Sequence, residues 1–234
     1  MIQSLRERIS EWYASEKKKL EGKSLREKIE YIAEYYWIQI VLIVGGLAFA
    51  IFAIYRANFA IKEYWLYGIF ANTMENGGNN SPVWQDFEEY AGYDLKQKNL
   101  EFNASSWFDP TVSGGTNNSY YQAFVAVTEA GDLDFVTLGK EGLQAVGSSG
   151  RLLDLNSEAC AKIRELYEDR FVYCLPYDEE YSTEEVPVGI DLSDSLLVTK
   201  YNLYEDDCVL GIGAYTKRPE NIKNFLAFIL SEES

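Results

Sequence analysis

Few side chains in this sequence could carry out acid–base or nucleophilic chemistry. The 234 residues contain no histidine, which removes the commonest general base and a common metal ligand together. A thiolate nucleophile at Cys160, Cys174 or Cys208 would lack its usual base, and an odd number of cysteines allows at most one internal disulfide. Asp132 and Asp134 would share one face of a strand, and we expect them at a solvated edge. The sequence therefore predicts no catalytic residues.

Acidic clusters are the other candidates for chemistry, because carboxylates are ligands for Ca²⁺. They lie at 178–180, 184–185 and 205–207, and none has the alternating Asp/Asn spacing of a calcium loop. Gly211 and Gly213 lack the third glycine of a dinucleotide-binding loop. We expect solvated charge at the acidic clusters, no metal site and no cofactor.

Charge is distributed unevenly along the chain. The formal net charge is −16, and after Tyr55 there are 13 Lys/Arg against 30 Asp/Glu. Such a domain repels phosphates, which argues against nucleic-acid binding. Because 47% of the residues are apolar, a wholly disordered chain is excluded.

One segment has the length and composition of a membrane span. The 21 residues from Tyr35 to Tyr55 are uncharged, and as a helix they extend roughly 31 Å, close to the hydrocarbon thickness of a bilayer. A cleaved signal peptide would have a shorter apolar region and a shorter preceding segment. The Lys/Arg excess before the span predicts a cytoplasmic N-terminus and an external C-terminal part. The expected divisions are 1–34 as a cytoplasmic helical stub, 35–55 as a transmembrane helix and 56–234 as an extracytoplasmic domain.

The stub contains a short repeat with helix-start signals. Ser4 with Glu7, and Ser24 with Glu27, have the spacing of capping boxes, and Gly22 suits a helix end. We expect one helix near 5–20 and a second from Ser24 into the membrane. The first helix either lies on a surface or docks a cytoplasmic partner, or it is a solvated stub that only sets orientation.

The remainder alternates strand-like and helical patterns, which predicts an α/β domain with a mixed sheet and flanking helices. Expected strands are 64–70, 99–104, 133–138, 171–175, 185–190, 195–198 and 208–215. Expected helices are 84–93, 120–130, 141–146, 156–168 and 219–231.

Four segments of this domain carry a family resemblance: 132–136, 150–155, 208–214 and 216–229. They resemble the acidic–apolar strand, the Gly-x-Leu-x-Asp-Leu stretch, a late strand and a late helix of extracellular solute-binding proteins of ABC transporters. The resemblance implies a bacterial, extracellular binding role in transport. Because 179 residues follow Tyr55, it implies one lobe rather than a two-lobed clamshell.

In that fold a ligand faces the carboxyl ends of the strands, as in open α/β sheets generally. Trp107 offers a flat stacking face, and the neighbouring Ser and Asn residues offer hydrogen bonds, which suits a neutral or cationic solute. The alternative is that Trp107 and Phe108 anchor the core or a loop. The candidate ligand-binding residues are Asn72, Thr73, Ser105, Ser106, Trp107, Phe108, Thr137 and Gly139.

The sequence thus favours a membrane-anchored, non-enzymatic solute-binding domain that is accessory to a transporter. A second hypothesis is an interaction or structural module that contacts a membrane permease or another membrane protein. An enzyme is the third hypothesis, supported only by acidic pairs. The expected partners are the solute, a membrane protein and the lipid bilayer.

Overall fold

Two helices form the first part of the chain, and the signals around Gly22 explain where they meet. The computed structural model describes residues 2–59, 63–176 and 184–231, in two units, Met1–Ile61 and Lys62–Ser234. In the first unit α1 (Ile2–Leu20) and α2 (Leu25–Phe59) are separated by Gly22, whose φ of 82° suits glycine. The capping box at Ser24 is confirmed, because the Ser24 amide donates to the Glu27 carboxylate at 2.8 Å. The cap expected at Ser4 is wrong, since α1 begins at Ile2.

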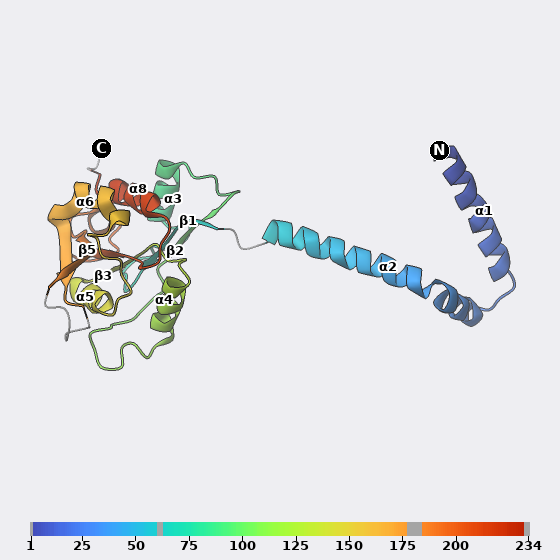
Figure 1. The fold of residues 1–234 in the computed structure, drawn as a ribbon, viewed down its shortest axis with the longest axis horizontal. Helices are drawn as coiled ribbons and strands as arrows, with labels where there is room; N and C mark the ends of the chain where they lie inside the picture. The colour runs from blue at the N-terminus through green and yellow to red at the C-terminus, as the bar shows by residue number, and fades with distance from the viewer. Residues whose placement is uncertain (1, 60–62, 177–183, 232–234) are drawn as a thin grey trace. The chain divides into compact units, whose positions relative to one another are not determined.

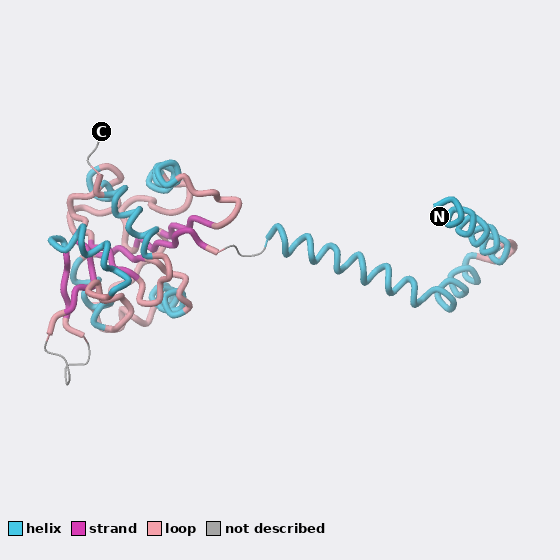
Figure 2. Tube along the Cα trace, turned by 45° about the horizontal axis from the view of Figure 1, so that its top comes forward, coloured by secondary structure: helices cyan, strands magenta, loops and turns pink. Residues whose placement is uncertain are grey.

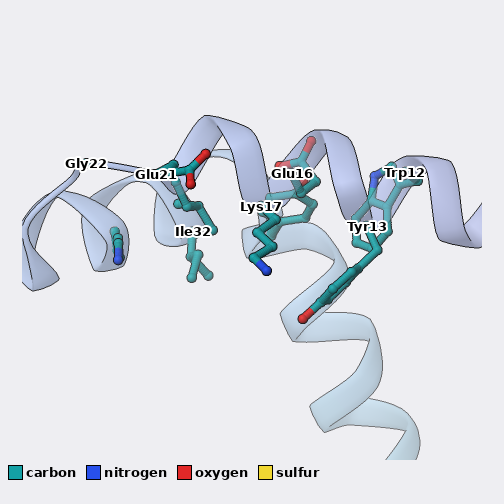
Figure 3. A pocket seen from close by; sticks show the side chains of 10 residues that line it. Trp12, Tyr13, Glu16, Lys17, Glu21, Gly22 and Ile32 are labelled. Atoms are coloured by element: carbon teal, nitrogen blue, oxygen red, sulfur yellow. The ribbon is translucent and has the colours of Figure 1, made fainter.

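α2 contains the apolar segment. The helix is long and apolar enough to cross a membrane, and the apolar side chains from Ile38 to Ile54 are exposed within the first unit. A core helix of a soluble domain would instead bury such a face. Figure 3 shows α1 lying beside the first turns of α2, with Glu16 on α1.

The second unit alternates strands and helices along the chain (Figure 1). The strands are β1 (Tyr64–Phe70), β2 (Asn99–Asn103), β3 (Phe135–Leu138), β4 (Phe171–Cys174), β5 (Val186–Asp191) and β6 (Val209–Ile212). The helices are α3 (Pro82–Ala91), α4 (Ser119–Glu129), α5 (Lys140–Ser148), α6 (Ala161–Tyr167), α7 (Leu196–Thr199) and α8 (Pro219–Ile229), with 3₁₀ turns η1 (Glu158–Cys160) and η2 (Glu168–Arg170).

The six strands form one mixed sheet in the order β2-β1-β3-β6-β5-β4. The first three strands are parallel to one another, whereas β6 runs antiparallel to β3 and to β5, and β4 antiparallel to β5. The chain passes from β1 to β2 on one side and then returns across β1 to β3. Because right-handed crossovers in opposite directions place their helices on opposite faces, this order predicts a sheet covered on both sides.

Two buried clusters confirm this layered arrangement. One face of the sheet packs against α3, α6 and α8, around Phe87 and Phe225. The other face packs against α4 and α5, around Phe124 and Leu143. Figure 2 shows the strands in the middle of the second unit, with helices around them. Gly68 of β1 permits close packing, because a Cβ there would lie 2.1 Å from the Phe135 ring.

Most expected elements are confirmed with small shifts of their ends, and one is wrong. Residues 195–198 were expected as a strand, but Leu196–Thr199 form the short helix α7. The expected helix at 156–168 is divided into η1, α6 and the start of η2. A short apolar run suits a buried helix turn as well as a strand, which explains the error at α7.

Candidate functional site

The carboxyl ends of β1 and β3 mark a point where the chain direction diverges. β1 and β3 are adjacent and parallel, and the connection that leaves β1 leads to β2 while the one that leaves β3 leads away from it, through α5 to β4. Adjacent connections that separate in this way leave a crevice at the carboxyl ends of the strands, and open α/β sheets bind ligands there. A ligand site is therefore expected at this edge of the sheet.

A hollow of about 420 Å³ lies at this edge. It is lined by Asn72, Phe108, Asp109, Pro110, Thr111, Leu138, Gly139, Lys140, Glu141, Gly142 and Asp207. The lining comes from the residues after β1, the loop after β2, the end of β3, the first turn of α5 and the segment before β6. Asn72, Phe108 and Gly139 are the sequence candidates that the fold brings together here.

Asn72 connects the end of β1 to the loop that follows β2. Its side-chain oxygen accepts from the Phe108 amide at 3.0 Å, and its side-chain nitrogen donates to the Phe108 carbonyl at 2.9 Å. Its backbone amide donates to the Ser106 carbonyl, and its φ of 58° lies in the left-handed region that Asn tolerates. Asn72 therefore fixes the loop that forms one wall of the hollow. Its side-chain amide is used in these hydrogen bonds to the Phe108 backbone.

Asp207 occupies the amino end of α5. Both of its carboxylate oxygens accept from the Lys140 amide, each at 2.9 Å. A Cβ at Gly139 would lie 2.8 Å from Asp207 Oδ2, so glycine allows this approach. A carboxylate at a helix amino end interacts favourably with the helix dipole. Because Asp207 already fills this position, a ligand anion gains little there.

Carboxylates outnumber cations around the hollow. Asp109, Glu141 and Asp207 line it against Lys140 alone. The Thr111 hydroxyl donates to Asp109 at 2.6 Å and the Thr111 amide at 2.9 Å, which lowers the pKa of Asp109 and keeps it ionised. The arrangement suits a neutral or positively charged group.

Tyr204 closes the opposite side of the same edge. Its hydroxyl lies 2.7 Å from Thr137 Oγ1 and donates toward the Ala71 carbonyl at 3.0 Å. Thr137 is fully buried, so this predicted ligand contact is instead the partner of a core tyrosine. Burial raises the pKa of Tyr204 well above its ordinary value and keeps the phenol neutral. Tyr204 therefore fills the space beside Thr137, and the hollow lies on the side of the edge nearer α5.

The remaining sequence candidates lie outside the hollow. Thr73 and Ser106 are buried, and Ser105 hydrogen-bonds the Asn103 side chain at 2.8 Å. Trp107 is 57% exposed and does not line the hollow, whereas its neighbour Phe108 is 4% exposed. The core-anchor interpretation is therefore wrong for Trp107 and right for Phe108, whose ring stacks on Phe124 with centroids 5.5 Å apart.

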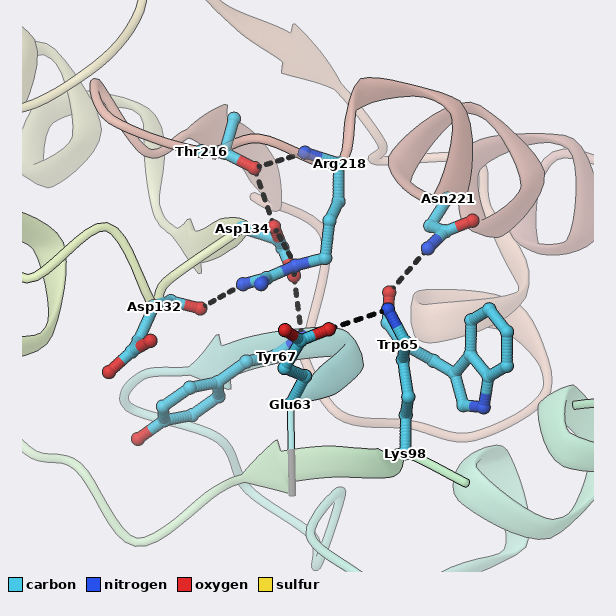
Figure 4. A network of polar contacts seen from close by, with 9 residues as sticks. All are labelled: Glu63, Trp65, Tyr67, Lys98, Asp132, Asp134, Thr216, Arg218 and Asn221. Atoms are coloured by element: carbon cyan, nitrogen blue, oxygen red, sulfur yellow. Dashed lines mark hydrogen bonds and ion pairs between the residues drawn. The ribbon is translucent and has the colours of Figure 1, made fainter. Parts of the chain in front are cut away.

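The acidic pair Asp132 and Asp134 precedes β3, at the sheet edge opposite the hollow. Asp134 is fully buried rather than solvated, because its carboxylate accepts from the Tyr67 amide, the Thr216 hydroxyl and Arg218 Nε (Figure 4). Arg218 also donates to the Asp132 carbonyl. Desolvation raises the pKa of Asp134, opposed by Thr216 and Arg218. This network links β1, the start of β3 and the segment that leads into α8. Its role is therefore structural.

The cysteines are not paired. Cys160, Cys174 and Cys208 are all free and buried, and desolvation raises the pKa of each thiol. Of the acidic clusters, 178–180 lies outside the described residues. Within the described ranges there is no group of three metal-ligating side chains.

Sequence reasoning missed the contributions of distant segments to this edge. Lys140 and Glu141 could have been included, because a helix that begins directly after a strand places its first turn at the carboxyl edge. Asp207 and Tyr204 gave no local signal, since they reach the edge only through the pairing of β6 with β3. Which lining residues bind a ligand remains a prediction. Comparison of the chain with protein-family models, with curated proteins and with solved structures finds no match.

Proposed function

We propose that this chain is a single-pass membrane protein whose extracytoplasmic α/β domain binds a neutral or cationic solute without chemistry, as an accessory to a transporter. The uncharged stretch from Tyr35 to Tyr55 within α2 supports the anchor. The excess of Lys/Arg before it supports a cytoplasmic N-terminus. The resemblance of β6 and α8 to late segments of solute-binding proteins supports the transport role.

The observation that carries the proposal is the hollow of about 420 Å³ beside the carboxyl ends of β1 and β3. Its size is in the range of small-molecule sites, and its place is the switch point of the sheet. Phe108 and Leu138 supply apolar surface, and Asn72 fixes the wall that carries Phe108. A site with one closed and one open side buries part of a ligand, so we expect modest affinity.

The charges around the hollow define the solute class. Asp109 and Glu141 both line it, one in the loop after β2 and one in the first turn of α5. An ammonium group between them would gain charge-assisted hydrogen bonds. Asp207 already caps α5, which disfavours an anionic solute at the helix end.

The test uses the full chain in lipid nanodiscs and a panel of amines, neutral sugars and carboxylates in equilibrium dialysis. We expect retention of at least one amine or neutral solute. If an amine is retained, Asp109→Asn and Glu141→Gln should each weaken it about tenfold, which is roughly the value of one charge-assisted hydrogen bond. Glu88→Gln on α3, outside the hollow, is the matched control. Equal binding by the hollow variants and by the control would overturn the assignment.

A second function, docking of a membrane protein, is favoured by one observation. Trp107, in the loop before α4, and Tyr120, in the first turn of α4, are exposed by 57% and 46%. Exposed aromatic side chains are enriched at interfaces between proteins. If this function holds, Trp107→Ala should abolish co-purification with a permease and leave solute binding unchanged.

A further inference from the structure

A second cleft lies in the first unit, between α1 and the start of α2. Its volume is about 570 Å³. α1 contributes Tyr13, Lys17 and Leu20 at helical spacing, and α2 contributes Lys28 and Ile32, also at helical spacing. Figure 3 shows Tyr13 and Lys17 extending from the side of α1 where α2 passes. Apolar walls with two ammonium groups suit an amphiphile that carries a negative charge.

Contacts between the two helices hold the cleft open without a ligand. The buried carboxylate of Glu16 on α1 accepts from the Tyr31 hydroxyl of α2 at 3.2 Å, and Lys19 Nζ of α1 donates to the same carboxylate at 2.7 Å. The Trp12 ring meets the Tyr36 ring edge to face, with centroids 6.2 Å apart. Because the cleft is formed before a ligand binds, the free energy of binding is not reduced by the cost of ordering its walls.

The same contacts place the cleft at the level where α2 becomes apolar. Tyr36 is the second residue of the uncharged stretch, so Trp12, which packs on it, lies at that level too. Trp12 and Tyr13 are 54% and 66% exposed. Such exposure is unfavourable in water and favourable in the interfacial zone of a bilayer, where Trp and Tyr are enriched. The cleft therefore lies at the interface of the bilayer that α2 enters, where a lipid can reach it.

Charge decides which lipid fits. Glu16 and Glu21 also line the cleft. Glu16 is engaged by Lys19 from outside the lining, which leaves the single carboxylate of Glu21 against the two ammonium groups of Lys17 and Lys28. Within the described part of the chain no ion pair engages Lys17 or Lys28. Lysines next to a membrane attract anionic headgroups.

We propose that the α1–α2 cleft binds one anionic phospholipid from the leaflet that α2 enters. Lys17 and Lys28 would contact the headgroup phosphate, and Leu20 and Ile32 the upper acyl chain. The inference rests on α2 being a membrane span, which belongs to the proposed function. It adds a specific lipid partner that anchoring alone does not require.

The test is native mass spectrometry of the full chain in detergent, titrated with phosphatidylglycerol or phosphatidylcholine. We expect the wild type to retain one phosphatidylglycerol in preference to phosphatidylcholine. Lys17→Gln should weaken retention about fivefold, and Lys17→Gln with Lys28→Gln about thirtyfold. Lys18→Gln removes the same charge outside the cleft lining and should stay within about twofold of the wild type.

Two further measurements separate the possible failures. Inorganic phosphate at millimolar concentration should not displace the lipid, because it lacks the acyl chain; displacement would overturn the lipid assignment. Alkaline extraction of membranes tests the span alone. If the chain resists extraction but the double variant retains phosphatidylglycerol like the wild type, the lipid site is refuted and the anchor stands. If the chain is extracted, the anchor fails and this inference fails with it.

Discussion

Trp107 and Phe108 are adjacent in sequence, and we predict opposite effects when each is replaced by alanine. Phe108 is 4% exposed, stacks on Phe124 and meets Tyr121 edge to face with centroids 5.4 Å apart. Its removal leaves a cavity against α4. Trp107 is 57% exposed, so its removal uncovers little buried surface.

The magnitudes follow from these environments. Phe108→Ala should lower the free energy of unfolding by about 3–5 kcal/mol, the usual cost of deleting a buried large aromatic side chain. Trp107→Ala should lower it by about 0.5 kcal/mol or less, as for other surface substitutions. For a domain of this size these values correspond to a fall in Tm of roughly 6–20 °C and roughly 2 °C or less.

The assay is urea unfolding of the fragment Lys62–Ser234, followed by far-UV circular dichroism, which does not depend on tryptophan emission. The fragment carries both hydrophobic clusters of the second unit, so the wild type should unfold in one cooperative transition. The slope should be the same for all three proteins, and only the midpoint should move. Equal costs at the two positions, or a cost above about 2 kcal/mol for Trp107→Ala, would refute the placement of these side chains.

Three further predictions use the same fragment. Asp134→Asn should destabilise it by about 3–5 kcal/mol in the urea assay, because it leaves Arg218 without its buried counter-charge. The hydrogen bond from Arg170 lowers the pKa of Asp194, so its ion pair stabilises the fold above the ordinary pKa of the carboxyl and is lost as the pH falls through the lowered pKa. Asp194→Asn should therefore remove about 0.2–1 kcal/mol of the acid dependence seen in melts between pH 6 and about pH 2, since the pair is largely exposed. Alkylation by iodoacetamide, counted by mass spectrometry, should modify the cysteines only in urea; modification of the folded fragment would contradict the burial of Cys160, Cys174 and Cys208.

Local patterns in the sequence predicted elements better than they predicted contacts. The strand 64–70 was predicted with the ends it has, because its run of aromatic and aliphatic residues is followed by a Gly/Asn-rich loop. The capping box at Ser24 was also readable, since Ser and Glu at this spacing satisfy free amides whatever surrounds them. The same Ser-x-x-Glu spacing at Ser4 does not mark a helix start, because α1 already begins at Ile2.

The site was predictable only to the extent that it depends on parallel strands. The rule for carboxyl ends placed Asn72 and Gly139 correctly at the edge that carries the hollow. The same rule also selected Thr137, but the Thr137 hydroxyl is hydrogen-bonded to the Tyr204 hydroxyl and does not face the hollow. That contact depends on where β6 inserts, and no local pattern specifies the order of strands in a sheet. Asp134 was misjudged for the same reason, because its partners Thr216 and Arg218 lie about eighty residues later in the chain.

The two proposed sites differ in the charge of the part of the chain that carries each of them. The domain that carries the hollow has 13 Lys/Arg against 30 Asp/Glu after Tyr55, so its field concentrates cations around an opening that is itself lined by carboxylates. The same field repels anionic headgroups, which leaves the lysines of α1 and α2 as the part of the chain suited to meet them. Association of a cationic solute with the hollow should therefore slow as ionic strength rises, because field attraction is screened within about 8 Å at physiological salt. Lipid retention should change less with salt, since the walls of Leu20 and Ile32 contribute a component that screening does not touch.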